Sequence, residues 1–151
     1  MRRIISLIFF VCCIYGQDSK LKITILDLDG VKVNENILKA CFGRLKSTLI
    51  NSGRFIVIEK RKREELLKEA KWQNSGACET DCAVEIGSQI GADFIVFGSL
   101  TFIQKNYHQI DLQIVDIEQG EAVEAVSYDA KGDFEVLLSR MEEASNEIVS
   151  R

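Results

Sequence analysis

Two cysteines have a spacing that suits covalent chemistry. Cys78 and Cys82 are separated by three residues, Glu-Thr-Asp. At a helix start, positions i and i+4 lie about 6 Å apart, which a disulfide can span. A redox dithiol usually has two intervening residues, and a metal site needs more ligands than a chain with one histidine offers. We therefore expect a structural Cys78–Cys82 disulfide, with free thiols and then redox or metal chemistry as alternatives. Cys41 lies on an apolar helix face and should be a buried thiol.

Asp27 and Asp29 follow an apolar run, in the segment Ile25-Leu26-Asp27-Leu28-Asp29-Gly30-Val31. This segment resembles the first motif of haloacid dehalogenase-like phosphatases. The resemblance implies that Asp27 is a nucleophile and Asp29 a general acid beside Mg²⁺. That chemistry also needs acidic metal ligands at a later strand end, and the sequence shows no such pair. We prefer two solvated aspartates at a strand end, and we keep the phosphatase as an alternative function.

Other polar residues carry weaker signals. Lys60, Arg61, Lys62 and Arg63 begin a predicted helix, where cations oppose the helix dipole. We interpret this run as a solvated helix entry, with contact to an anionic partner or lipid headgroup as the alternative. His108 stands alone on a predicted strand and is expected at the surface. The glycines do not form a phosphate-binding fingerprint, so we expect no cofactor, no metal and no small-molecule substrate.

Hydrophobic periodicity predicts the elements that position these residues. Apolar runs and polar–apolar alternation predict strands, and apolar residues at helical spacing predict helices. The strands are expected at 22–28, 55–58, 94–103, 110–114 and 123–128, and the helices at 37–50, 60–71, 82–90 and 134–149. The order βαβααβββα predicts an α/β fold in which helices cover a mixed sheet of about five strands. The early strands need crossover connections, and the later ones form an antiparallel meander.

The N-terminus has the pattern of an export signal. The basic start Met1-Arg2-Arg3 precedes an apolar stretch, Ile4–Tyr15, that is too short to cross a membrane as a helix. Gly16 is a small residue at the cleavage position. We predict a signal peptide at 1–16 and one domain at 17–151, with a buried strand or an uncleaved anchor as alternatives. The residues before Cys12 and Cys13 do not favour lipidation at either.

Composition bounds the class of protein. Hydrophobic residues make up 46% of the 151 residues and charged residues 28%, which supports a folded core rather than disorder. The formal net charge is −4, and removal of Arg2 and Arg3 with the leader makes the remainder more acidic. A surface of that sign repels phosphate backbones, so nucleic acid is not an expected partner.

Three segments together resemble a known family. They are 53–60 (GRFIVIEK), 90–100 (IGADFIVFGSL) and 112–120 (LQIVDIEQG), with a charged helix after the first. They resemble the CsgG superfamily of bacterial envelope proteins, which includes CsgG-like, LpoB-like and TolB N-terminal-like periplasmic domains. The motif positions carried by the resemblance are Gly53, Gly91, Ala92, Asp93, Gly98, Asp116 and Gly120. We expect structural roles for them, as helix end, strand entry, close backbone approach and hairpin turn.

The resemblance implies a non-catalytic envelope protein. The chain lacks a convincing lipidation motif and has no room for membrane-spanning hairpins, whose strands need about 9–11 alternating residues each. We therefore expect no pore. The expected function is a protein-interaction or assembly module in the periplasm or at the outer-membrane periphery. Its partner would be an envelope protein or another copy of itself, with peripheral membrane contact as a further possibility.

Overall fold

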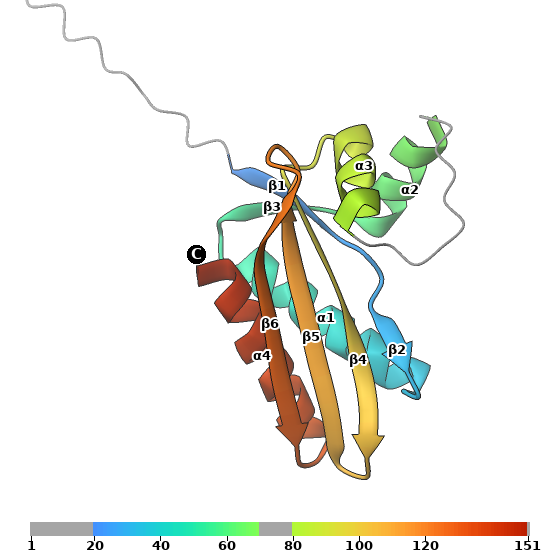
Figure 1. Cartoon of the computed structure of the whole chain (residues 1–151), viewed down its shortest axis with the longest axis vertical. Coiled ribbons are helices and arrows are strands. Elements are labelled where there is room, and N and C mark those ends of the chain that lie inside the picture. Colours follow the sequence, from blue (N-terminus) through green and yellow to red (C-terminus); the bar gives the residue numbers. More distant parts are fainter. Residues whose placement is uncertain (1–19, 70–79, 151) are drawn as a thin grey trace, which may run out of the picture.

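The computed structural model describes residues 20–69 and 80–150 (Figure 1). These residues form ten helices and strands in the order ββαβααβββα. In chain order they are β1 (Leu21–Ile25), β2 (Asp29–Val31), α1 (Glu35–Asn51), β3 (Phe55–Ile58), α2 (Lys60–Glu69), α3 (Thr80–Ile90), β4 (Phe94–Gln104), β5 (Tyr107–Asp116), β6 (Glu121–Lys131) and α4 (Phe134–Ser150).

The strands join in one mixed sheet. Its order is β3-β1-β4-β5-β6, and β2 pairs with β4 further along the same strand. β1 is parallel to β3 and β4, and β2 is parallel to β4, whereas β4, β5 and β6 form an antiparallel meander. The predicted α/β class, the crossovers and the meander are confirmed. The sheet has six strands rather than about five, because β2 was not expected.

β2 continues the line of β1 after a one-residue irregularity. Ile25 pairs with Val96, and Asp29 pairs with Ser99. Residues 26–28, between β1 and β2, therefore lie opposite only two residues of β4, at 97 and 98. Such an extra residue shifts the alternation of side chains by one. The side chains of Leu26 and Leu28 consequently pack into different hydrophobic clusters. Asp27 is exposed between them and stands outside the ladder.

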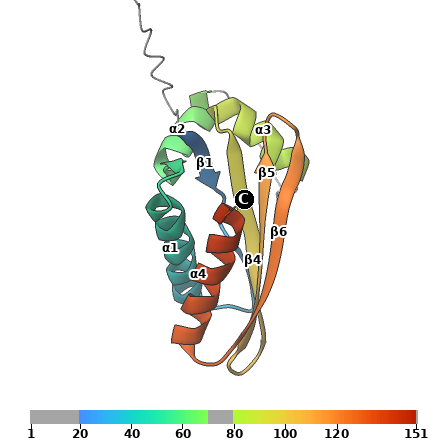
Figure 2. The same cartoon turned by 90° about the vertical axis from the view of Figure 1, so that its left-hand side faces the viewer.

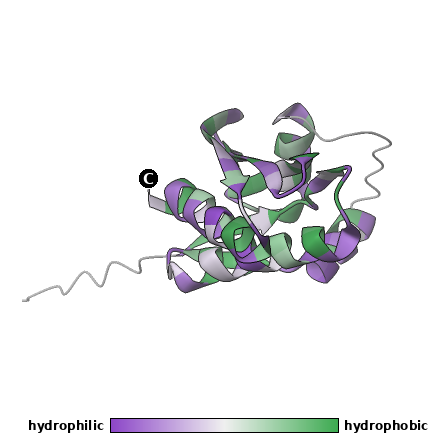
Figure 3. Cartoon of the chain, turned by 90° about the horizontal axis from the view of Figure 1, so that it is seen from below, coloured by the Kyte–Doolittle hydropathy of each residue, from purple (hydrophilic) through white to green (hydrophobic). Residues whose placement is uncertain are grey.

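Helices α1 and α4 cover one face of the sheet. In Figure 1 they lie behind β4, β5 and β6, and Figure 2 shows the two layers from the side. Hydrophilic and hydrophobic residues alternate along helices and strands, as expected of elements with one buried face (Figure 3). The larger core lies between the layers. Its fully buried side chains include Ile23, Leu45, Leu49, Val96, Leu100, Ile110 and Met141.

Helices α2 and α3 form a smaller layer against the opposite face, at one end of the sheet (Figure 1). A second cluster fills the space beneath them. It contains Leu26, Ala83, Ile86, Ile90, Ala92, Ile95 and Val115. Because α2 and α3 cover only that end, no helix of residues 20–69 and 80–150 covers the remainder of this sheet face.

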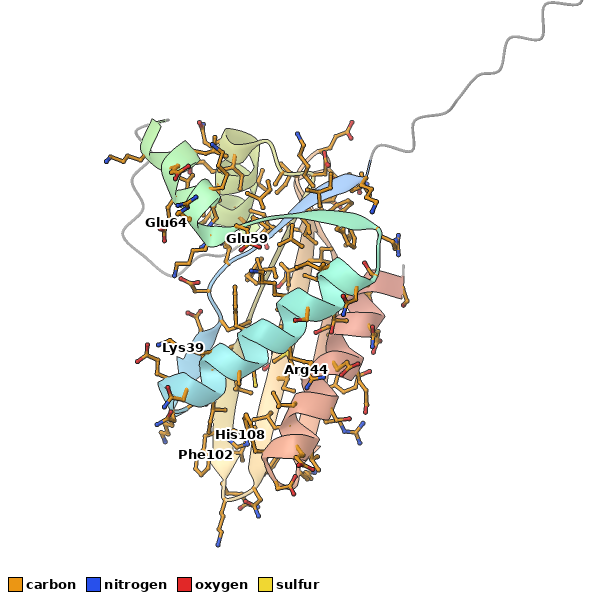
Figure 4. The ribbon with its side chains drawn as sticks, turned by 180° about the vertical axis from the view of Figure 1, so that it is seen from behind. Lys39, Arg44, Glu59, Glu64, Phe102 and His108 are labelled. Atoms are coloured by element: carbon orange, nitrogen blue, oxygen red, sulfur yellow. The ribbon has the colours of Figure 1, made fainter. Side chains whose placement is uncertain are left out.

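Caps and ion pairs fix the helices. The backbone N–H of Asn36 donates to the Asn34 side chain at the start of α1, and that of Val136 donates to Asp133 at the start of α4. Arg44 of α1 pairs with Glu142 of α4 at 2.8 Å, which joins the two helices (Figure 4). Both side chains are nearly half exposed, so this pair contributes little to stability.

Candidate interaction surfaces

Asp27 and Asp29 do not converge on one site. Asp27 pairs with Lys60 at 2.6 Å and with Arg63 at 3.9 Å, and it opens on a hollow beside α1. Asp29 belongs to β2 and opens on a different hollow, across the sheet from α1. A nucleophile and a general acid must address the same reacting atom. The geometry therefore does not favour the phosphatase alternative.

The basic residues at the start of α2 differ in burial. Arg63 is buried, and its guanidinium donates to the backbone carbonyl of Ile25 as well as facing Asp27. Burial lowers the pKa of Arg63, and the Asp27 carboxylate opposes that shift. Arg61 and Lys62 are exposed and lie 3.7–3.8 Å from Glu65. Arg63 thus attaches α2 to β1, and Arg61 and Lys62 remain accessible to a partner.

The two aspartates of the sequence motifs, Asp93 and Asp116, form hydrogen bonds with backbone groups of neighbouring residues. The Asp93 carboxylate accepts from the backbone N–H of Lys22 at 2.6 Å, and the Asp93 backbone N–H donates to the Lys22 carbonyl at 2.8 Å. Asp116 accepts from the N–H of Gln119 through its side chain and from the N–H of Gly120 through its carbonyl. Asp93 therefore fixes the entry of β4 beside β1, and Asp116 builds the β5–β6 turn.

The motif glycines lie where backbone geometry restricts side chains. A Cβ at Gly98 would stand 2.0 Å from the carbonyl oxygen of Asp111 on β5, so no larger residue fits there without movement. Gly120 has a φ of +71° in the β5–β6 turn. The remaining motif residues lie after α1 and between α3 and β4, at Gly53, Gly91 and Ala92.

The uncovered sheet face of β2, β4, β5 and β6 is polar. Alternate residues of neighbouring strands form rows across it: Asp29, Ser99, Asp111 and Ser127 in one row, and Thr101, Gln109 and Asp129 in the next. A hollow of about 460 Å³ lies on this face. The sequence signal for it is the polar residue at every second position of each strand.

On the same face, near the β4–β5 turn, Asp129 and Lys131 form an ion pair with each other. Lys131 lies 3.2 Å from the Asp129 carboxylate and 4.7 Å from the centre of the Tyr107 ring. The Tyr107 hydroxyl donates to Asp129 at 3.0 Å. Lys131 and Tyr107 both lower the pKa of Asp129, and the hydrogen bond to Asp129 raises the pKa of Tyr107.

A second, apolar pocket opens at the other end of the sheet, beside the last turns of α4. Its volume is about 280 Å³. Leu21 and Val123 on its rim are 41% and 45% exposed, which is high for large apolar side chains. Phe55, Phe94, Ile114 and Ile148 also line it, and Arg54 and Glu124 complete the lining. A pocket of this kind can receive one apolar side chain of a partner protein.

β6 is the edge strand of the meander. An edge strand carries backbone N–H and C=O groups that its sheet does not pair. The β5–β6 register shifts between Ile114 and Val115, which leaves Val123 as the unpaired residue of a bulge at the apolar pocket. Bulges of this type redirect a side chain at a sheet edge.

The other sequence predictions concern cysteines and a histidine. Cys78 lies outside the described residues, so the disulfide with Cys82 stays a prediction. Cys41 is fully buried, as expected. His108 is partly buried, and its ring stands edge-on to Phe102 at 5.5 Å (Figure 4). Within 20–69 and 80–150, no three histidine, cysteine or acidic side chains gather in a way that would hold a metal ion.

None of the helices in the described part of the chain is both long and apolar enough to cross a bilayer.

One protein family matches this sequence. Residues 37–124 match the family described as "Peptidoglycan-synthase activator LpoB". The match begins in α1, ends in β6 and covers more than half of the 151 residues. No curated protein sequence matches the chain.

Solved structures share the fold. The LpoB C-terminal domain from Escherichia coli aligns with a TM-score of 0.62 at 14% identity, over 76% of this chain and 85% of that one. A PelC dodecamer from Paraburkholderia phytofirmans aligns at 0.58 and 9% identity, over 89% and 90%. TolB from Acinetobacter baumannii aligns at 0.54 and 15% identity, over 85% of this chain and 26% of that one. At such identities the likeness extends to the fold alone.

Proposed function

This chain belongs to the LpoB family of peptidoglycan-synthase activators, and from that membership we propose that it activates a peptidoglycan synthase by direct protein contact. The observation that carries the proposal is the family match over residues 37–124, which includes β3, α2, α3, β4 and β5 entire. The role is non-catalytic. The divergence of Asp27 and Asp29 agrees with it, because the two carboxylates cannot act on one atom.

Two surfaces suit a protein partner. The β6 edge offers unpaired backbone groups, and the apolar pocket beside Val123 offers an anchor for one side chain. Arg61 and Lys62 offer exposed positive charge on α2. We propose that the synthase contacts the β6 edge first, since that surface combines backbone pairing with an apolar anchor.

The location follows from the partner. Peptidoglycan is an envelope polymer, so an activator of its synthase must reach the envelope. We propose that residues 1–16 are removed on export and that residues 17–151 form one domain in the periplasm or at the outer-membrane periphery. We propose further that Cys78 and Cys82 form a disulfide there, and that neither Cys12 nor Cys13 is lipidated.

The test is a reconstituted polymerisation assay. Residues 17–151 are added to each purified peptidoglycan synthase of the same organism, and glycan formation from the lipid-linked disaccharide precursor is followed. We expect at least one synthase to work several-fold faster and to bind the chain in a direct assay. A chain that neither binds nor accelerates any of them would overturn the proposal.

Variants then locate the contact. Val123→Lys places a charge at the rim of the apolar pocket and should weaken binding about tenfold, since an apolar anchor is lost. Ile56→Lys is the matched control, because Ile56 is similarly exposed, at 52%, and lies in β3, at the opposite edge of the sheet from β6. Equal binding by both variants would exclude the β6 edge as the contact.

A second candidate function is self-assembly. Its support is that PelC, a protein of the same fold, forms a dodecamer. Light scattering on residues 17–151 distinguishes the two candidates, because a stable oligomer formed without any synthase favours assembly.

A further inference from the structure

The uncovered sheet face holds a hollow with negative charge. We define the acidic hollow as the cavity of about 460 Å³ whose polar lining comprises Asp29, Ser99, Asp111, Gln113 and Ser127. It lies on the sheet face opposite α1 and α4, the two helices that Figure 1 draws behind the sheet. α3 bounds it at one end, where Gln113 lies 3.5 Å from Thr80. Among residues 20–69 and 80–150 no helix covers the hollow, and its walls belong to hydrogen-bonded strands of one sheet.

Asp111 is held in a fixed orientation. Its Oδ1 accepts from the Ser127 hydroxyl at 2.7 Å and from the Gln109 amide at 3.2 Å. The Gln109 amide also reaches the Ser127 hydroxyl, at 3.3 Å. These contacts use one carboxylate oxygen and leave Oδ2 without a partner in the described part of the chain. Asp111 thus presents a pre-oriented acceptor.

Asp29 presents a second acceptor in the same row. It is exposed, and its carboxylate makes no hydrogen bond or ion pair with residues 20–69 and 80–150. Asp29 pairs with Ser99, and Ser99 pairs with Asp111. Two strand spacings separate the carboxylates, so their Cα atoms lie about 10 Å apart. One donor group with several N–H bonds can lie between them.

No lysine or arginine lines the hollow in the described structure. Lys131, on the same sheet face, is already paired with Asp129. Within the described residues, two carboxylates therefore share a concave surface without a compensating cation. Their electrostatic complement is a positive group, and a guanidinium matches best because it is planar, always charged and carries five donors.

We propose that the acidic hollow receives an arginine side chain from a basic segment of the peptidoglycan synthase. This inference rests on the proposed function for the identity of the partner. The arginine lies over Ser99 and donates to Asp29 on one side and to Asp111 on the other. The side chains of Ser99, Gln113 and Ser127 form hydrogen bonds with the backbone of the synthase segment that carries the arginine. The apolar pocket at β6 is a separate surface and is not needed for this contact.

The experiment compares isosteric variants. Asp29→Asn combined with Asp111→Asn removes both charges and keeps an acceptor for Ser127 and Gln109. Glu118→Gln combined with Glu135→Gln is the matched control, because both residues are exposed and lie outside the hollow. Far-UV circular dichroism and thermal melting verify that each variant is folded. Synthase affinity is then measured at low and at moderate salt.

We expect the hollow variant to bind the synthase about a hundredfold more weakly, since each charge-assisted hydrogen bond contributes about tenfold. The control should bind like the wild type. The wild-type affinity should fall with salt, and that of the hollow variant much less. If the wild type binds and the hollow variant binds equally well, the acidic hollow is excluded while the proposed function stands. A wild type that binds no synthase overturns the proposed function itself.

A small probe tests the recognition chemistry without the synthase. N-acetyl-arginine amide is titrated into ¹⁵N-labelled residues 17–151. We expect shifts at Ser99, Asp111 and Ser127 that vanish in the hollow variant. If the N-acetylglucosamine trimer shifts these residues and the arginine probe does not, the hollow is a glycan site and the proposal is wrong. A wild-type oligomer that the hollow variant disperses would overturn it as well.

Discussion

Cys41 is a thiol that the core makes unreactive. It is fully buried among apolar side chains, and burial raises its pKa to about 11. Since the thiolate is the reactive form, and a raised pKa of this size lowers the thiolate fraction by about a hundredfold, alkylation must be slow in the folded state. We expect iodoacetamide at pH 8 to modify Cys41 only after denaturation, as measured by mass spectrometry of residues 17–151.

The same labelling experiment tests the predicted disulfide. Residues 17–151 contain three cysteines: Cys41, Cys78 and Cys82. Denatured chain without reductant should take up one label, at Cys41, and three after reduction. Three labels without reductant would show that Cys78 and Cys82 are not bridged. Rapid labelling of Cys41 in the native protein would contradict its burial in the core.

His108 should titrate below its ordinary pKa. Partial burial beside Phe102 lowers the His108 pKa, because burial disfavours the charged imidazolium. The folded state then binds fewer protons than the unfolded state between the lowered pKa and about 6.5. Stability contributed by His108 is present above that window and is lost as the pH falls through it.

The measurement for His108 is an NMR titration of its ring protons, with a midpoint below 6.5 expected. Because the ring is only partly buried, the effect on unfolding should be small. His108→Gln should flatten the acid-side decline of the thermal midpoint between pH 7 and pH 5. A titration midpoint above 6.5 would contradict the shift.

At the scale of elements, Arg63 attaches α2 to the sheet. Its guanidinium pairs with the Ile25 carbonyl inside the protein and faces Asp27 at the irregularity between β1 and β2. Arg63→Met leaves that carbonyl unpaired, which should lower the free energy of unfolding by about 2 kcal/mol. Urea denaturation measures the change.

Arg61→Met is the control for Arg63, on the same helix. Its side chain is 91% exposed, so the effect should stay within about 0.5 kcal/mol. Equal losses from both variants would mean that the effect comes from helix propensity rather than from the buried contact.

The contact of β4 with β5 depends on Gly98. Gly98→Ala places a Cβ 2.0 Å from the Asp111 carbonyl oxygen, and backbone must move to relieve the overlap. We expect a loss of about 3 kcal/mol or more in chemical denaturation. Gly43→Ala is the control. Gly43 lies inside α1 with no heavy atom within 4 Å of the added Cβ, so it should gain about 0.5–1 kcal/mol.

Much of the element order was predictable from local pattern. The helices at Glu35–Asn51 and Phe134–Ser150 follow apolar spacing and capping residues, and the strands of the meander follow period-two alternation. β2 escaped prediction because it has three residues and a glycine, and because the extra residue at Asp27 breaks the alternation that would reveal it. Its pairing is set by β4, which lies about 70 residues later.

The acidic hollow was not predictable for a related reason. Asp29 and Asp111 are far apart in sequence and meet only through the registers of β2 with β4 and of β4 with β5. A register shift of one residue would turn either side chain to the opposite face. The sequence shows which residues alternate, but the register across three strands decides which of them become neighbours.

At the scale of the whole molecule, one sheet separates two cores. Val96 belongs to the cluster under α1 and α4, and its neighbour Ile95 belongs to the cluster under α2 and α3. The same holds for Ile114 and Val115 on β5. Because side chains alternate along each strand, neighbouring residues of β4 and β5 at these positions pack into opposite cores. Loss of either cluster removes packing from strands that the other one needs.

The two cores should therefore unfold together. Leu45→Ala opens a cavity in the larger cluster and Ile86→Ala opens one in the smaller, and each should cost about 2–5 kcal/mol. Both variants should show one transition in urea, coincident by far-UV and near-UV circular dichroism. An early, separate transition in Ile86→Ala alone would mean that α2 and α3 detach while the rest stays folded. A single transition would mean that the α2–α3 layer unfolds together with the sheet whose strands form the acidic hollow.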